Sequence, residues 1–174
     1  MDLHPALRGL DWLPSAADLS SPTPRSFRSL LSRIAVHTEV WSPIVRHDPV
    51  DRWFAPLLIC SSVEVWLIGW WPGQSTPLHD HGGATGALTV LSGVLSEEAV
   101  SASGGLDPTR RTLAPGTTAI VDAGTIHRVG NTGPIRATSI HAYSPPGREL
   151  RTYADAPPVW RVTVHDEADT AARR

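Results

Sequence analysis

The stretch Gly73-Gln-Ser-Thr-Pro-Leu-His79-Asp80-His81 places two histidines two residues apart. On a strand, residues two apart point to the same face of the sheet, so both imidazoles can reach one metal ion. Imidazole is a ligand for iron, copper, nickel and zinc. A His-Asp-His cluster can equally be a polar turn, because short patterns of this kind have a high false-positive rate.

A second stretch puts a third histidine just after a tight turn. It reads Gly116-Thr-Thr-Ala-Ile-Val-Asp122-Ala-Gly124-Thr-Ile-His127-Arg-Val-Gly-Asn131. In order and in spacing, the two stretches resemble the two motifs of the cupin superfamily, the first of which continues through Gly86 to Gly93. The resemblance implies an all-β fold, a small jelly-roll-like barrel with the ligand histidines facing its interior.

Short strands punctuated by Gly and Pro dominate the chain from Leu57 onward, a pattern typical of an all-β sandwich or barrel. The predicted strands are Val63–Trp70, Ala87–Leu91, Val94–Glu97, Thr117–Val121, His127–Val129 and Ala137–Tyr143. Tyr153–Val164 is predicted as a last strand or as a cover over the barrel.

The first fifty residues follow a different pattern. Phe27, Leu30, Leu31 and Ile34 recur at three and four, which predicts an amphipathic helix beginning near Pro24. A weaker pattern predicts a second short helix over Thr38–Val45. We expect residues 1–50 to form a helical segment packed on the barrel, residues 51–165 to form the cupin barrel, and residues 166–174 to be a disordered tail.

Two positions depart from the general cupin pattern. Gly86 stands where many cupins carry a metal-binding Glu, and Asp122 stands where Pro is common. Without a carboxylate ligand, three neutral imidazoles leave the charge of a divalent ion uncompensated. Such a site favours anionic groups from the substrate, and a thiolate or a carboxylate would serve.

A third segment narrows the family. Ser139, His141 and Tyr143 alternate along one predicted strand, so they share one face and can form a hydrogen-bonded relay. Standing alone, such a triplet is more often a polar face of an outer strand. Together with the three histidines, the relay resembles the thiol dioxygenases, in particular bacterial-type cysteine dioxygenase type I. The resemblance covers about residues 50 to 146.

The resemblance implies an iron-dependent enzyme. In that family three histidines bind Fe(II), here His79, His81 and His127. It also implies that Tyr143 donates a hydrogen bond to the substrate carboxylate or to an oxygen intermediate, oriented by His141, which Ser139 holds. The expected substrates are a small thiol such as L-cysteine and O2, and the expected product is the sulfinic acid. The alternative substrate is 3-mercaptopropionate or another small thiol.

The substrate-binding arginine of the family is matched by Arg52, which lies 27 residues before His79. A guanidinium fork suits a carboxylate geometrically, and Tyr143 would share in binding the substrate. A small shift of alignment would instead put Trp53 or Ala55 there, and Arg52 could also be a surface partner of Asp51. The family's Tyr–Cys thioether is not expected, because Gly86 replaces that Cys.

Composition excludes several other classes. The chain has 174 residues, enough for one domain, and its fifteen basic residues are all Arg, so no active-site lysine is possible. Cys60 is the only cysteine, which excludes an intrachain disulfide and a multi-cysteine zinc site. The net charge of −2 argues against nucleic-acid binding.

The sequence also lacks membrane signals. No apolar run approaches the roughly 20 residues that a membrane helix needs, and the N-terminus lacks the features of a secretory signal. We expect a cytoplasmic protein with no membrane partner, either a monomer or a small homo-oligomer.

Two alternative functions remain open at this stage. One is a different cupin oxygenase, such as one that cleaves a diketone or quercetin, and the Ser139-His141-Tyr143 relay argues against it. The other is a non-enzymatic cupin that binds a metal as a sensor or storage module, which the absence of a DNA-binding region makes less attractive.

Overall fold

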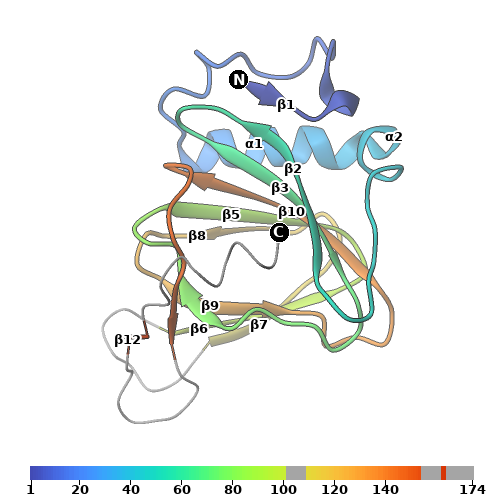
Figure 1. Cartoon of the computed structure of the whole chain (residues 1–174), viewed down its shortest axis with the longest axis vertical. Coiled ribbons are helices and arrows are strands. Elements are labelled where there is room, and N and C mark those ends of the chain that lie inside the picture. Colours follow the sequence, from blue (N-terminus) through green and yellow to red (C-terminus); the bar gives the residue numbers. More distant parts are fainter. Residues whose placement is uncertain (101–108, 154–161, 164–174) are drawn as a thin grey trace.

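The computed structural model describes residues 1–100, 109–153 and 162–163. Most of the described chain is strand, with one long helix near the N-terminus (Figure 1). The elements in chain order are β1 (Asp2–Leu3), the 3-10 helix η1 (Pro5–Leu7), α1 (Pro24–Val36), α2 (Thr38–Trp41), β2 (Trp53–Ile59), β3 (Glu64–Trp70), β4 (Leu78–Asp80), β5 (Thr85–Ser92), β6 (Leu95–Val100), β7 (Thr109–Leu113), β8 (Thr118–Val121), β9 (Ile126–Gly130), β10 (Ala137–Ser144), β11 (Arg151–Tyr153) and β12 (Val162–Thr163).

The strands form two six-stranded antiparallel sheets, one layered over the other (Figure 1). Their orders are β1-β2-β3-β10-β5-β8 and β12-β11-β4-β9-β6-β7. The sheets do not close into a continuous barrel among the described residues, and their stacking is jelly-roll-like. The predicted all-β, cupin-like fold is therefore confirmed, as two facing sheets.

Two hydrophobic cores hold these layers together. The inter-sheet core draws on strands of both sheets and comprises Trp70, Leu88, Val90, Leu95, Leu113, Ala119, Val129 and Ala137. The outer core lies on the other face of the first sheet, where Val65, Leu67 and Ile140 pack against the N-terminal segment. Neighbouring residues of a strand thus serve different cores, as the alternation of side chains requires.

Helix α1 covers the outer face of the first sheet (Figure 1). It begins where predicted, because Pro24 follows the N-cap Thr23, whose hydroxyl accepts from the Ser26 N–H at 3.2 Å. Its apolar stripe, Phe27, Leu30, Leu31 and Ile34, is buried against the sheet. The second predicted helix is shorter than expected, since α2 ends at Trp41.

Some strands were not predicted. Strand β2 begins at Trp53, before the expected start at Leu57, because Pro56 obscures the alternation and the register shifts between Pro56 and Leu58. The N-terminal residues add β1, which pairs with β2. Strands β11 and β12 lie within or beside the predicted last strand, while residues 154–161 and the predicted tail, 166–174, lie outside the described residues.

The described residues contain no helix long and apolar enough to cross a membrane.

Burial of the α1 stripe leads to a stability prediction. Ile34 is fully buried, whereas Val36, two residues later on the same helix, is 73% exposed. We expect Ile34→Ala to lower the free energy of unfolding by about 2–5 kcal/mol in a urea titration, because it leaves a cavity. The control Val36→Ala should change it by no more than about 0.5 kcal/mol. Equal effects of the two variants would contradict the packing described for α1.

Candidate metal centre

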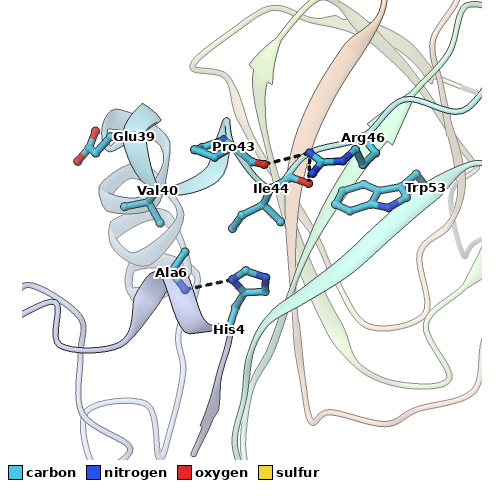
Figure 2. A pocket seen from close by; sticks show the side chains of 8 residues that line it. All are labelled: His4, Ala6, Glu39, Val40, Pro43, Ile44, Arg46 and Trp53. Carbon is cyan, nitrogen blue, oxygen red and sulfur yellow. Dashed lines mark hydrogen bonds between the residues drawn. The ribbon is translucent and has the colours of Figure 1, made fainter.

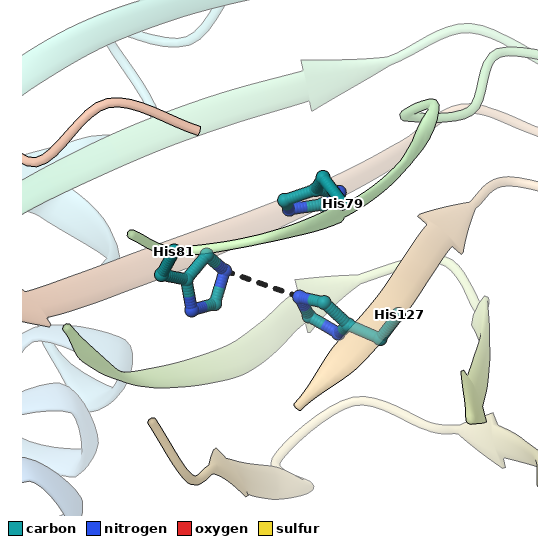
Figure 3. A group of neighbouring side chains, drawn as sticks. All are labelled: His79, His81 and His127. Carbon is teal, nitrogen blue, oxygen red and sulfur yellow. Dashed lines mark hydrogen bonds between the residues drawn. The ribbon is translucent and has the colours of Figure 1, made fainter. Parts of the chain in front are cut away.

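Three histidines converge between the sheets, from β4, β9 and the residue after β4. His79 pairs directly with His127 in the ladder between these strands, and His81 follows one residue after the end of β4. One ring nitrogen from each of the three lies within 4.8 Å of the others (Figure 3). The side chains are buried, at 4%, 3% and 2% exposure for His79, His81 and His127. We call these three residues the histidine cluster.

Hydrogen bonds on the far side of the His79 and His127 rings determine which ring nitrogen faces the centre of the histidine cluster. The Nδ1 of His79 lies 2.9 Å from the carbonyl oxygen of Pro77, and the Nδ1 of His127 lies 2.8 Å from Oε1 of Glu97. A carbonyl and a carboxylate can only accept, so in both rings Nδ1 carries the proton. The Nε2 of His79 and of His127 therefore presents a lone pair that can bind a metal.

Glu97 is the residue that sequence reasoning missed. Its carboxylate is 1% exposed and also accepts from Nε of Arg111 at 2.5 Å. Burial alone would raise the pKa of Glu97, but the hydrogen bonds from His127 and Arg111 outweigh burial and lower it. One feature of the sequence could have revealed it. Glu97 alternates with Leu95 along the strand, so an acidic residue stands at an inward position that an apolar residue would ordinarily take.

The third ring completes a donor set that fits a metal ion. The Nε2 atoms of His81 and His127 lie 3.1 Å apart (Figure 3). Two nitrogens that each bind one ion at about 2 Å are separated by about 3 Å, so this spacing suits two ligands of one metal. The buried Nδ1 of His81 has no hydrogen-bond partner among the described residues, so it can take the ring proton when Nε2 binds a metal.

The desolvated rings are poor bases. Burial lowers the pKa of His79 to about 4, and the neighbouring His127 adds to the shift. Burial likewise lowers the pKa of His81 to about 3, again with contributions from the other two rings. The two rings are therefore neutral near pH 7, as metal ligation requires.

Asp80 lies between His79 and His81, and its carboxylate accepts hydrogen bonds from residues outside the histidine cluster. Its carboxylate accepts from the Gly82 N–H at 2.7 Å and from the Tyr153 hydroxyl at 2.5 Å. Because Tyr153 belongs to β11, which pairs with β4, this contact joins the metal-ligand strand to its neighbour. The aspartate therefore supports the end of β4, between His79 on the strand and His81 just after it.

Gly86 lies opposite Tyr143 in the first sheet and beside the ring of His81. A Cβ at Gly86 would approach the His81 Cε1 to 2.8 Å and Nδ1 to 3.0 Å, closer than real Cβ contacts. The cluster thus packs against a position without a side chain. Cys60, the only thiol, lies beside the outer core, on the other face of the sheet.

The relay residues are brought together by β10. The Oγ of Ser139 lies 2.9 Å from Nε2 of His141, and Nδ1 of His141 lies 3.1 Å from the hydroxyl of Tyr143. The Tyr143 ring packs against the His81 ring with centroids 4.8 Å apart. Burial lowers the pKa of His141 well below its ordinary value and raises the pKa of Tyr143, so both groups are neutral.

Arg52 directly precedes β2 and contacts Trp70 of the inter-sheet core, whereas the two alternative residues lie toward the outer core. Trp53 packs against the outer core, and Ala55 pairs with Leu67, an outer-core residue. The guanidinium of Arg52 instead lies 5.1 Å from the ring centroid of Trp70 and donates to the Ser75 carbonyl at 3.3 Å. Its buried Nε has no partner among the described residues, so it retains donor capacity.

A separate hollow of about 440 Å³ lies near the N-terminus and shares no residue with the histidine cluster (Figure 2). Its two basic side chains are engaged locally, since Arg46 donates to the carbonyls of Pro43 and Ile44 and His4 accepts from the Ala6 N–H. The lining is His4, Ala6, Glu39, Val40, Pro43, Ile44, Arg46 and Trp53. We assign the chemistry to the histidine cluster.

Comparison with protein families identifies the family of the chain. A family model described as cysteine dioxygenase type I matches residues 36–156, well over half of the chain. The chain belongs to the cysteine dioxygenase type I family. With its three-histidine cluster, this family member is a metal-binding cupin related to oxidoreductases.

Solved structures share the fold of this cysteine dioxygenase family member. One from Thermus thermophilus is 23% identical with a TM-score of 0.53, over 60% of this chain and 92% of that one. A double-stranded β-helix protein from Klebsiella pneumoniae is 22% identical with a TM-score of 0.54, over 64% and 91%. A cupin from Desulfitobacterium hafniense is 17% identical with a TM-score of 0.50, over 60% and 86%. These likenesses concern the fold alone.

The lowered pKa values give a pH prediction for the metal-free protein. The unfolded chain binds protons on His79 and His81 near pH 6.5, whereas the folded chain does so only near pH 4 and pH 3. The free energy of unfolding should therefore fall as the pH drops from about 6.5 to about 4, by about 1 kcal/mol per pH unit for each histidine.

Urea titrations of chelator-treated protein at a series of pH values measure this dependence. The double variant His79→Gln/His81→Gln should flatten the slope, while His4→Gln, outside the cluster, should leave it in place. A wild-type stability that stayed level between pH 6.5 and pH 4 would contradict the burial of neutral rings.

Glu97 gives a prediction with a matched control on the same strand. Glu97→Gln should weaken Fe(II) and Co(II) binding by about 10–100-fold, because His127, the expected ligand, would lose its anionic partner. Glu98→Gln should have little effect, since Glu98 pairs with Arg128 and Arg110 instead. Competition with a coloured chelator measures both affinities, and equal affinities in the two variants would refute the role given to Glu97.

Proposed function

We propose that this protein is an Fe(II)-dependent thiol dioxygenase that converts a small thiol such as L-cysteine to its sulfinic acid. The supporting observation is the juxtaposition of a buried three-imidazole cluster with the hydroxyl relay of Tyr143. A metal-binding cupin with another task has no need of such a relay. The family membership of the chain supports the same chemistry.

The three neutral imidazoles explain why we propose an anionic substrate. His79, His81 and His127 would hold the metal as neutral donors, since no carboxylate among the described residues belongs to the cluster. Iron, when bound, would lower the pKa of a coordinated thiol and activate dioxygen. The overall reaction adds both atoms of O2 to sulfur, so that RSH and O2 give RSO2H without another reductant.

Arg52 is the proposed clamp for a substrate carboxylate. It stands on the inner face beside Trp70, and its remaining N–H groups can donate to an anion in the forked geometry that carboxylates accept. Both cysteine and 3-mercaptopropionate carry such a carboxylate, whereas cysteamine does not. The proposal therefore extends to small thiol carboxylates as a class, with cysteine as its first candidate.

The relay has a positioning and a donating part. Tyr143 is the proposed catalytic residue that touches the substrate or its oxygen atoms, because its ring packs against that of His81 and its hydroxyl is neutral. His141 would hold that hydroxyl in place, and Ser139 would hold His141. Ser139 and His141 are buried, which keeps bulk water away from the inner end of the relay.

An oxygen electrode tests the proposed function. Iron-reconstituted protein should consume one O2 per thiol with cysteine or 3-mercaptopropionate and release the sulfinate, with cysteamine a poor substrate. Arg52→Gln should raise KM about 10–100-fold through the lost charged hydrogen bonds, with kcat less affected. The control Arg136→Gln removes an arginine that stacks on Trp71 instead and should leave KM unchanged.

Three results would contradict the proposal. One is consumption of a flavonol or a diketone with no oxidation of any thiol. Another is tight metal binding with no oxygen uptake at all, as expected of a sensor or storage protein. The third is a His127→Ala protein that keeps full iron content and full turnover.

A further inference from the structure

A fourth polar group extends the relay at its inner end. The indole Nε1 of Trp70 lies 2.8 Å from Oγ of Ser139, and both residues are fully buried. Four groups on two adjacent strands, β3 and β10, thus form one continuous chain of hydrogen bonds from Trp70 to Tyr143. The direction of those bonds decides what the Tyr143 hydroxyl can do.

The indole sets the direction at the first link. An indole N–H can only donate, so the Ser139 oxygen must accept from Trp70. Among the described residues, the other polar atom within hydrogen-bond distance of the Ser139 Oγ is Nε2 of His141. Since buried hydroxyl protons are almost always donated, the Ser139 proton goes to that nitrogen.

The second link follows from the chemistry of a neutral imidazole. One of its nitrogens donates and the other accepts, so an accepting Nε2 requires a protonated Nδ1. The Nδ1–H of His141 then donates to the oxygen of Tyr143, 3.1 Å away. The Tyr143 hydroxyl accepts the hydrogen bond from His141, so its own proton remains available to donate to another group.

We propose that Trp70 is a positioning residue that fixes the tautomer of His141, and so makes Tyr143 a hydrogen-bond donor toward the site. The opposite direction would have Nε2–H of His141 pointing at Ser139, which already receives the indole N–H. Two donors would then face the Ser139 oxygen and leave its own proton without an acceptor in a dry interior, an arrangement that buried groups avoid.

The same indole meets Arg52 on its face, with the guanidinium 5.1 Å from the ring centroid. Its edge holds the relay while its face supports the proposed carboxylate clamp. A benzene ring could replace the second contact but not the first, since it has no N–H. This difference separates the two roles by experiment.

The inference rests on the proposed function only for the use that Tyr143 makes of its proton. The tautomer is a property of the folded chain, and nitrogen-15 NMR reads it directly. We would label histidine, load the full chain with diamagnetic Zn(II), and assign the His141 signals by their loss in His141→Gln. The expected result is a pyrrole-type Nδ1 and a pyridine-type Nε2.

Three changes then test the part played by Trp70. Trp70→Phe should remove the preference, so that the His141 nitrogens give averaged shifts. Replacement of Trp70 by 3-benzothienylalanine, which keeps the two fused rings and replaces N–H by sulfur, should do the same if Trp70→Phe fails to fold. Trp71→Phe, a neighbouring indole that holds Arg136, is the control and should keep the wild-type spectrum.

Kinetics on the iron-loaded protein add a second readout. The benzothienyl protein keeps a face for Arg52, so KM for the thiol should stay constant while kcat falls about two- to tenfold, in line with the loss of the competent tautomer. A protonated Nε2 in the wild type, or an unchanged tautomer without the indole N–H, would overturn the inference. The expected tautomer in a protein that oxidises no thiol would sink only the proposed function.

Discussion

The site depends on burying imidazole rings between two sheets and on the partners that their nitrogens find there. A nitrogen buried away from bulk water is stabilised by a protein partner or a metal ion, and the Nδ1 of His81 is the buried ring nitrogen of the cluster that lacks a hydrogen-bond partner among the described residues. His79 meets a carbonyl, His127 a carboxylate and His141 a hydroxyl on either side. These partners decide which nitrogen carries the proton, and therefore which lone pairs and which hydroxyl face the substrate.

Because side chains alternate along a strand, the two faces of the first sheet carry different kinds of residue. Ser139, His141 and Tyr143 face inward, while Ile140 and Ala142 between them join the outer core beneath the N-terminal segment. The sheet can therefore carry polar residues on its inner face because helix α1 buries apolar area on the other. The N-terminal segment thus contributes stability without supplying a residue to the histidine cluster or the relay.

Local patterns predicted what depends on local geometry. The sequence predicts that His79 and His81 lie together and that the relay residues share one face, because side chains of a strand repeat every two residues. It predicts the helix at Pro24 from the apolar stripe of that helix. Partnerships across strands were not. Glu97 reaches His127 only because β6 and β9 pair in one register, and Trp70 reaches Ser139 only because β3 and β10 are neighbours.

The charge expected at the histidine cluster depends on two residues. Gly86 supplies no carboxylate ligand, and the carboxylate of Glu97 binds the far side of the His127 ring. Gly86 has no side chain that could bind a metal beside His81, so among the described residues a metal ion would meet only the imidazoles of the histidine cluster. The negative charge sits instead one ring away, on Glu97 behind His127, where Arg111 partly neutralises it. A divalent ion held by the histidine cluster would therefore keep most of its positive charge, and Arg52 adds a second positive charge beside Trp70. Two positive charges on the inner side of the first sheet would favour the proposed substrate class, because a thiol carboxylate supplies two anionic groups when its thiol is deprotonated.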